Sequence, residues 1–120
     1  MDNSIGSLLS IRLRFSDDAR LGPGKIALLE AVERTGSVAA AGQSLGMSER
    51  RALLLIESLT AFFGEPVVLI DPHSGEARVS ALGSELVRAF RAVEADARRS
   101  LDTQFAAVRA KMSAHRDHSS

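Results

Sequence analysis

Two adjacent arginines, Arg50 and Arg51, are the residues of this sequence best placed to bind a partner. They follow Ser48, whose side chain can cap a helix by accepting a bond from a backbone N–H in the first turn. Positive charges in that turn oppose the helix dipole, so local stability alone would favour acidic residues. Arginine can bond O6 and N7 of guanine or bind a phosphate group. The placement therefore indicates contact with nucleic acid; the alternative is that both side chains fill a solvated face beside Glu49.

The segments before these arginines have the pattern of a helix-turn-helix. One apolar stripe predicts a helix over residues 25–34, which ends at Gly36. Ser37 can cap a second, short helix, and Gly46 tolerates the positive φ of a tight turn at its end. Ser37 and the free amides behind it could also bind a phosphate group, or serve as a cap alone. Because small residues permit a close crossing, we expect a helix-turn-helix.

The next helix, predicted from Glu49 to about Phe63, should bury one face and expose the other. Its core stripe has the spacing i, i+3, i+4, i+7 and consists of Ala52, Leu55, Ile56 and Leu59. The opposite face carries Arg50, Leu54, Glu57 and Ala61, with Arg51 and Leu53 on its flanks. In the major groove, Leu54 could contact a thymine methyl group, or it could pack on a protein partner instead.

A β-hairpin wing is predicted after this helix. The run 67–70 is mostly β-branched, residues 71–75 form a turn, and residues 77–79 can return as a second strand. His73, Ser74 and Arg78 could approach backbone phosphates or the minor groove, although neighbouring acidic residues would oppose them. The candidate DNA-binding residues are therefore Ser37, Ser48, Arg50, Arg51, Leu54, His73, Ser74 and Arg78.

A long C-terminal helix is predicted over residues 81–112, with Ser80 as its cap. Its apolar residues repeat at spacings of three and four, and the chain offers no further helix to cover them. Such an uncovered seam favours self-association, so we expect a homodimer. The predicted dimer contacts are Leu86, Phe90, Val93, Ala97, Leu101, Phe105 and Val108.

Composition limits the possible functions. With 120 residues, 45% of them hydrophobic and 25% charged, the chain has room for one folded core. No apolar run approaches the roughly 20 residues of a membrane span, and no basic start precedes the first apolar patch, so we expect a cytoplasmic protein without membrane contact. The formal net charge is zero, whereas nucleic-acid binders usually carry excess Lys and Arg.

Catalysis and metal binding find no support in the sequence. There is no cysteine, no recognisable set of nucleophile, base and orienting acid, and no glycine-rich phosphate loop of the usual spacing. We therefore expect neither an enzyme nor a cofactor or metal site.

The predicted organisation has four parts and is mainly α. An N-terminal segment covers residues 1–10, a winged helix-turn-helix domain residues 11–80, a dimerisation helix residues 81–112, and a flexible tail residues 113–120.

Residues 36–64, GSVAAAGQSLGMSERRALLLIESLTAFFG, closely resemble the DNA-binding domain of ModE-type molybdate-responsive regulators and, more distantly, LysR-type regulators. The resemblance extends over about residues 11–97, and its most specific piece is GMSERRALLL. It departs from the family at Glu49, where tyrosine is usual, at Leu53, where tryptophan is frequent, and in the wing tip DPHSGEA, which replaces a glycine-rich one. Full-length ModE proteins also carry a C-terminal molybdate-binding module, which residues 113–120 are too short to supply, so no molybdate binding is expected from this chain alone.

Two functions follow from these observations. The first is a homodimeric transcriptional regulator that binds double-stranded DNA with its third helix in the major groove. The alternative is a protein-interaction or dimerisation module with the same fold that does not bind DNA. The alternative is favoured by the zero net charge, by two acidic residues and by two leucines expected to be exposed: Glu49, Glu57, Leu53 and Leu54. The motif spacing and the two arginines favour DNA.

Overall fold

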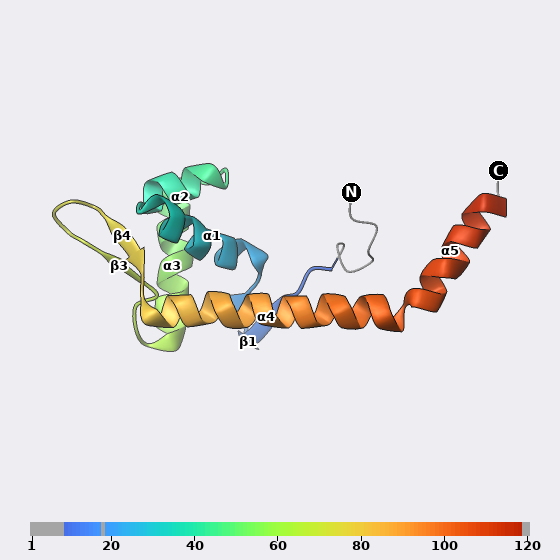
Figure 1. The fold of residues 1–120 in the computed structure, drawn as a ribbon. Helices are drawn as coiled ribbons and strands as arrows, with labels where there is room; N and C mark the ends of the chain where they lie inside the picture. The colour runs from blue at the N-terminus through green and yellow to red at the C-terminus, as the bar shows by residue number, and fades with distance from the viewer. Residues whose placement is uncertain (1–8, 18, 119–120) are drawn as a thin grey trace. The chain divides into compact units, whose positions relative to one another are not determined.

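The computed structural model describes residues 9–17 and 19–118. Its elements, in order, are β1 (Leu13–Ser16), β2 (Ala19–Leu21), α1 (Pro23–Thr35), α2 (Val38–Ser44), α3 (Glu49–Phe63), β3 (Val68–Ile70), β4 (Ala77–Val79), α4 (Ala81–Gln104) and α5 (Ala106–His118) (Figure 1). Residues 11–90 form one compact unit, and the chain from residue 91 belongs to another. The predicted N-terminal segment falls almost wholly on residues 1–8, which lie outside the described residues.

Helices α1, α2 and α3 surround the core of the first unit. Ile26, Leu29 and Val32 of α1 are completely buried, as their stripe in the sequence predicts. Gly36 ends α1 with φ of +72°, a left-handed conformation that glycine adopts without steric penalty. The predicted helix-turn-helix is confirmed.

The turn between α2 and α3 depends on two glycines. Gly46 has φ of +73°, as expected for the tight turn. A Cβ on Gly42 would lie 3.2 Å from the Met47 carbonyl oxygen and 3.3 Å from Cβ of Ala52. The crossing of α2 and α3 is therefore close, as the small residues of α2 predict, and it leaves little room for any side chain at residue 42.

A small hairpin precedes α1. In the sequence, Ile11, Leu13 and Phe15 alternate with polar residues, which predicts one strand, and the glycines and proline of residues 17–24 predict a turn after it. β1 and β2 pair antiparallel, with Leu13 opposite Leu21 and Arg14 opposite Arg20. Phe15 stacks on Phe62 near the end of α3, with ring centroids 5.3 Å apart. The strand β2 was missed because three residues are too few to show alternation.

The wing has the predicted boundaries. β3 and β4 pair antiparallel with Val68 opposite Val79 and Ile70 opposite Ala77. At the tip, Oδ1 of Asp71 accepts hydrogen bonds from the backbone N–H groups of His73 and Ser74, at 2.8 and 3.3 Å. This local bonding pattern stabilises the turn between the strands.

Helix α4 begins against the base of the wing. Its residues 81–90 belong to the compact unit, which therefore extends beyond the expected boundary at residue 80. Leu82, Leu86 and Val87 pack against the core, and Phe90 is buried within it. The predicted single helix over residues 81–112 is wrong in one respect, because the helix is interrupted at Phe105. Neither proline nor glycine stands there, so the sequence carried no sign of the break.

The predicted flexible tail also differs from the structure. Helix α5 continues to His118, and only residues 119–120 of the tail lie outside the described residues. The helices within the described ranges include none that is long and apolar enough to cross a lipid bilayer.

Gly83, in the first turn of α4, provides a test of this packing. A Cβ there would lie 2.5 Å from Cγ1 of Val79 and closer still to the Val67 carbonyl oxygen. We expect Gly83→Ala to lower the free energy of unfolding by about 1–3 kcal/mol, as overpacking does elsewhere. Gly24→Ala is the matched control, because a Cβ on Gly24 in α1 meets nothing within 4 Å. Urea denaturation measures both, and equal midpoints for the two variants would contradict the account.

Candidate nucleic-acid interface

The outward face of α3 has the composition that its periodicity predicts. Ala52, Ile56 and Leu59 are buried in the core, and Leu55 is half-buried against it. On the opposite side, Arg50, Arg51, Leu54 and Glu57 are exposed, Leu54 by 56%. Glu49, Arg50, Leu53, Leu54 and Glu57 line a shallow hollow. This face therefore offers one central guanidinium, an apolar side chain and two carboxylates.

Ser37 and Ser48 act as helix caps. Oγ of Ser37 accepts a hydrogen bond from the Ala40 N–H, and Oγ of Ser48 accepts one from the Arg51 N–H, each at 3.1 Å. Each hydroxyl still carries its own hydrogen, which a phosphate oxygen can accept. The cap is thus compatible with the predicted DNA contact and does not depend on it.

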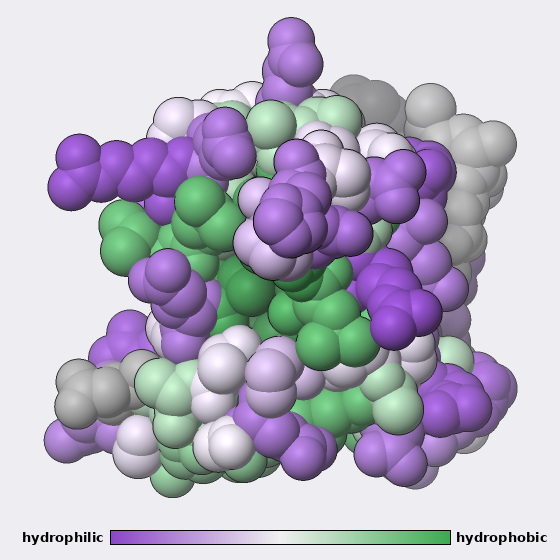
Figure 2. Space-filling view, turned by 90° about the vertical axis from the view of Figure 1, so that its left-hand side faces the viewer, coloured by the Kyte–Doolittle hydropathy of each residue, from purple (hydrophilic) through white to green (hydrophobic). Residues whose placement is uncertain are grey.

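His73, Ser74 and Arg78 are all exposed on the wing. Ser74 Oγ accepts a hydrogen bond from the Glu76 N–H at 3.2 Å, which holds it at the tip. Arg78 lines a hollow together with the acidic residues Asp71 and Glu76 and with apolar residues of both strands. Figure 2 shows the side of the molecule on which the wing lies, with apolar side chains gathered at the centre between polar ones. The wing is therefore less basic than the start of α3.

The residues predicted for the dimer seam have two different environments. Phe90 is 2% exposed and Leu86 packs against the same core, so both stabilise their own chain. The prediction that Phe90 lies in a dimer seam is therefore wrong. The apolar repeat in the sequence does not distinguish residues of the core from residues of an interface. Further along, Val93, Phe105 and Val108 are 45–46% exposed, and Ala97 and Leu101 are half-buried.

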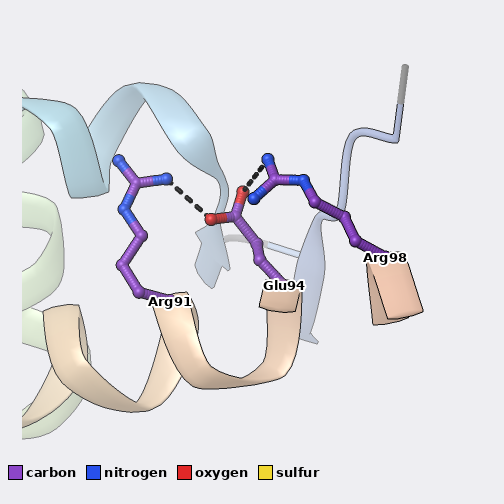
Figure 3. A network of polar contacts seen from close by, with 3 residues as sticks. All are labelled: Arg91, Glu94 and Arg98. Atoms are coloured by element: carbon purple, nitrogen blue, oxygen red, sulfur yellow. Dashed lines mark hydrogen bonds and ion pairs between the residues drawn. The ribbon is translucent and has the colours of Figure 1, made fainter. Parts of the chain in front are cut away.

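A buried carboxylate on α4 was missed by the sequence analysis. Glu94 is 3% exposed, and its Oε1 lies 2.7 Å from Nη1 of Arg91 (Figure 3). Its Oε2 lies 3.8 Å from Nη2 of Arg98. The spacing i−3 and i+4 could have suggested these pairs, but not the burial that distinguishes Glu94 from other acidic residues.

A second feature that sequence reasoning missed is a hollow at the start of α1, called the basic hollow below. Its cationic side chains are Arg12, Arg20, Lys25 and Arg51, and its other lining residues are Leu21, Gly22, Pro23, Gly24, Met47 and Leu55. The Lys25 ammonium donates a hydrogen bond to the Arg20 carbonyl oxygen at 2.7 Å. Burial, and then the charge of Arg20, lower the pKa of Lys25. The four cations are spread over forty residues of sequence, so only the fold brings them together.

Comparison with known proteins supports the resemblance seen in the sequence. Molybdenum-pterin-binding protein MopB of Rhodobacter capsulatus is 35% identical over 80 residues, which are 64% of this chain and 30% of that protein. MopA of the same organism is 31% identical over 90 residues, covering 72% of this chain and 34% of MopA. Over the aligned residues the chain is similar in sequence to these molybdenum-pterin-binding proteins. It spans about a third of the length of these curated relatives, and no protein-family model matches it.

A solved structure confirms the fold of this chain. The DNA-binding domain of CbnR, a LysR-type regulator, was solved in complex with DNA and aligns with a TM-score of 0.57 at 24% identity. The match covers 71% of this chain and 95% of that domain. The predicted fold class, a mainly α winged helix-turn-helix with a short hairpin wing, is therefore confirmed.

The buried Glu94 provides a prediction for stability. We expect Glu94→Ala to lower the free energy of unfolding by about 1–3 kcal/mol, because both arginines lose a charge-assisted partner. Asp96→Ala is the control, since Asp96 pairs with Arg99 on the same helix and both side chains are 72% exposed. Exposed pairs contribute about 0–1 kcal/mol. Thermal melts followed by circular dichroism compare the two, and a larger loss for Asp96→Ala would refute the assignment.

Proposed function

We propose that this chain is a transcriptional regulator that binds duplex DNA as a homodimer, with α3 in the major groove. The observation that carries the proposal is the orientation of the first turn of α3. Ala52 is fully buried, while its neighbours Arg50 and Arg51 are exposed. The packing of the helix thus presents two guanidiniums on a rigid element, which is the arrangement that base readout in the major groove requires.

The distribution of charge supports the proposal despite the zero net charge of the chain. Arg50 and Arg51 stand at the start of α3, and Arg51 also lines the basic hollow with three further cations. Binding to DNA depends on the charges that meet phosphates, since each contact releases counterions. Glu49 and Glu57 on the same face, and acidic residues elsewhere on the chain, therefore weaken the attraction without removing these local contacts.

Exposed apolar side chains on α4, on α5 and at the break between them support the homodimer. Val93, Phe105, Val108 and Met112 are 45–53% exposed. Val93 lies on the same stripe of α4 as Ala97 and Leu101, at spacings of four. A second copy of this stripe would cover it, and a two-fold dimer that binds successive major grooves must present its two α3 helices about 34 Å apart, one turn of DNA.

The relatives are named for molybdenum-pterin binding. We propose that this chain does not have that property. The chain spans only a third of their length. Among the described residues there is no group of three or more His, Cys, Asp or Glu that could hold a metal ion. We propose that this chain supplies the DNA-binding part of a ModE-like regulator in the cytoplasm, without an enzymatic activity and without binding molybdate.

One observation favours the alternative, a protein-interaction module that does not bind DNA. Leu54 is 56% exposed on the same face as Glu49 and Glu57, and Leu69 and Ile70 of the wing are 40% and 45% exposed. Exposed apolar residues beside carboxylates suit a protein surface better than a phosphate backbone.

The arginines test the DNA-binding proposal. Because Arg50 lies near the centre of the outward face, Arg50→Ala should reduce affinity for a bound duplex by about 1–3 kcal/mol per half-site and relax preference at one base pair. Arg51, on the flank, should act on phosphates, so Arg51→Ala should weaken all duplexes and reduce the salt slope by about one. Gel shifts over a salt series measure both effects.

Arg99→Ala is the matched control for these gel shifts. Arg99 is exposed on α4 outside the winged domain, and its loss removes the same charge. Folding of every variant is checked by circular dichroism. Unchanged affinity in both α3 variants would contradict the proposed role of α3, and a parent chain that shifts no duplex at low salt would favour the interaction module.

The homodimer has its own test in Val93→Asp. A charge placed in an apolar interface without a partner is strongly unfavourable, so the variant should be monomeric where the parent has the mass of two chains. Thr103→Asp is the control, because Thr103 is exposed on α4 away from the stripe. Light scattering gives the masses. A monomeric parent, or a Val93→Asp variant that remains dimeric, would show that this stripe makes no dimer.

A further inference from the structure

We infer that the basic hollow binds one phosphate group, and that in the complex with DNA this group belongs to the DNA backbone. The second half of the inference rests on the proposed DNA-binding function, whereas the first half does not. The hollow lies wholly within the compact unit of residues 11–90, so its walls are fixed by one core.

Four different segments bring positive charge to the hollow. Arg12 precedes β1, Arg20 lies on β2, Lys25 is in the first turn of α1 and Arg51 in the first turn of α3. The stem of Arg12 lies against Gly22, where a Cβ would be 3.4 Å from its Cγ. None of the described residues that line the hollow is acidic. The site is therefore complementary to an anion on charge alone.

Gathering these cations is unfavourable for the free protein. Arg20 stands opposite Arg14 in the β1–β2 register, and like charges at such positions repel each other. Arg14 has Asp17 as a partner, with Nη1 and Oδ1 3.7 Å apart. Burial is the main cause of the lowered pKa of Lys25, and the charge of Arg20 lowers it further. A bound anion would offset the repulsion.

The start of α1 adds hydrogen-bond donors to the charge. Its N-cap, Gly22, offers no side chain to accept a bond from the first turn, and Pro23 follows. A Cβ on Gly24 would meet nothing within 4 Å, so the space in front of this turn is open. Backbone N–H groups there can bond an oxyanion that the four side chains attract.

Arg51 connects the hollow to the proposed DNA-binding face. It lines the hollow and also follows Arg50 in the first turn of α3. When α3 enters a major groove, phosphates of the flanking strand lie beside its N-terminus. A phosphate in the hollow would fix the register of the domain on the duplex while Arg50 reads a base.

Titration with inorganic phosphate tests the oxyanion site without DNA. The amide signals of Gly22, Gly24 and Lys25 in the full chain should shift saturably in NMR spectra. The shifts should be lost in Arg20→Gln and Lys25→Gln and retained in Arg14→Gln, which removes the same charge from the same hairpin but does not line the hollow. Two variants are used so that one poorly folded protein does not decide the result. Absent or unsaturable shifts, or shifts unchanged in both variants, would overturn the site.

The salt dependence of DNA binding tests the source of the oxyanion. Arg20→Gln should reduce the salt slope by about one, the loss of one phosphate contact, and Arg14→Gln should reduce it less. Inorganic phosphate could bind while the salt slope is the same in both variants. In that case the hollow does not bind a phosphate of the DNA backbone, and its ligand is free phosphate. If the parent binds no duplex, the proposed function fails, and the phosphate titration still decides whether the hollow is an anion site.

Discussion

The close crossing of α2 and α3 is the constraint on which the rest of the structure depends. Gly42 brings the two helices together, with space for a Cβ limited by Ala52 and by backbone carbonyl oxygens. Because Ala52 is fully buried in this contact, the helical period directs Arg50 and Arg51 away from the core. A larger residue at position 42 would move α3 and, with it, the orientation of both guanidiniums.

Around this crossing, the chain concentrates positive charge in the basic hollow, while the outward face of α3 carries Glu49 and Glu57 beside Arg50. Arg51 belongs both to the outward face of α3 and to the basic hollow, whose other cations come from the hairpin and α1. In the wing, Arg78 lies in a hollow with Asp71 and Glu76, so the wing adds little positive charge to a DNA-binding surface. A net charge of zero is thus compatible with phosphate binding, because the charges nearest the phosphates contribute most.

The features that sequence predicted are those with local causes. Ser37 and Ser48 bond the first turns that they precede, and Gly36 has the positive φ that ends a helix. The missed features depend on contacts between distant segments. The basic hollow joins residues forty positions apart, and Phe90 continues the same apolar repeat as Val93 although only Phe90 lies in the core. Periodicity identifies an apolar face but not what covers it.

Site-directed cleavage of DNA tests most directly whether α3 reads the major groove. The sequence contains no cysteine, so a Leu54→Cys variant can carry a single iron chelate that cuts DNA nearby. The account predicts cuts confined to the base pairs under α3, at two places one helical turn apart, and none from the same chelate on Ala107→Cys of α5. Protein that binds the duplex without cutting it from residue 54 would contradict the account.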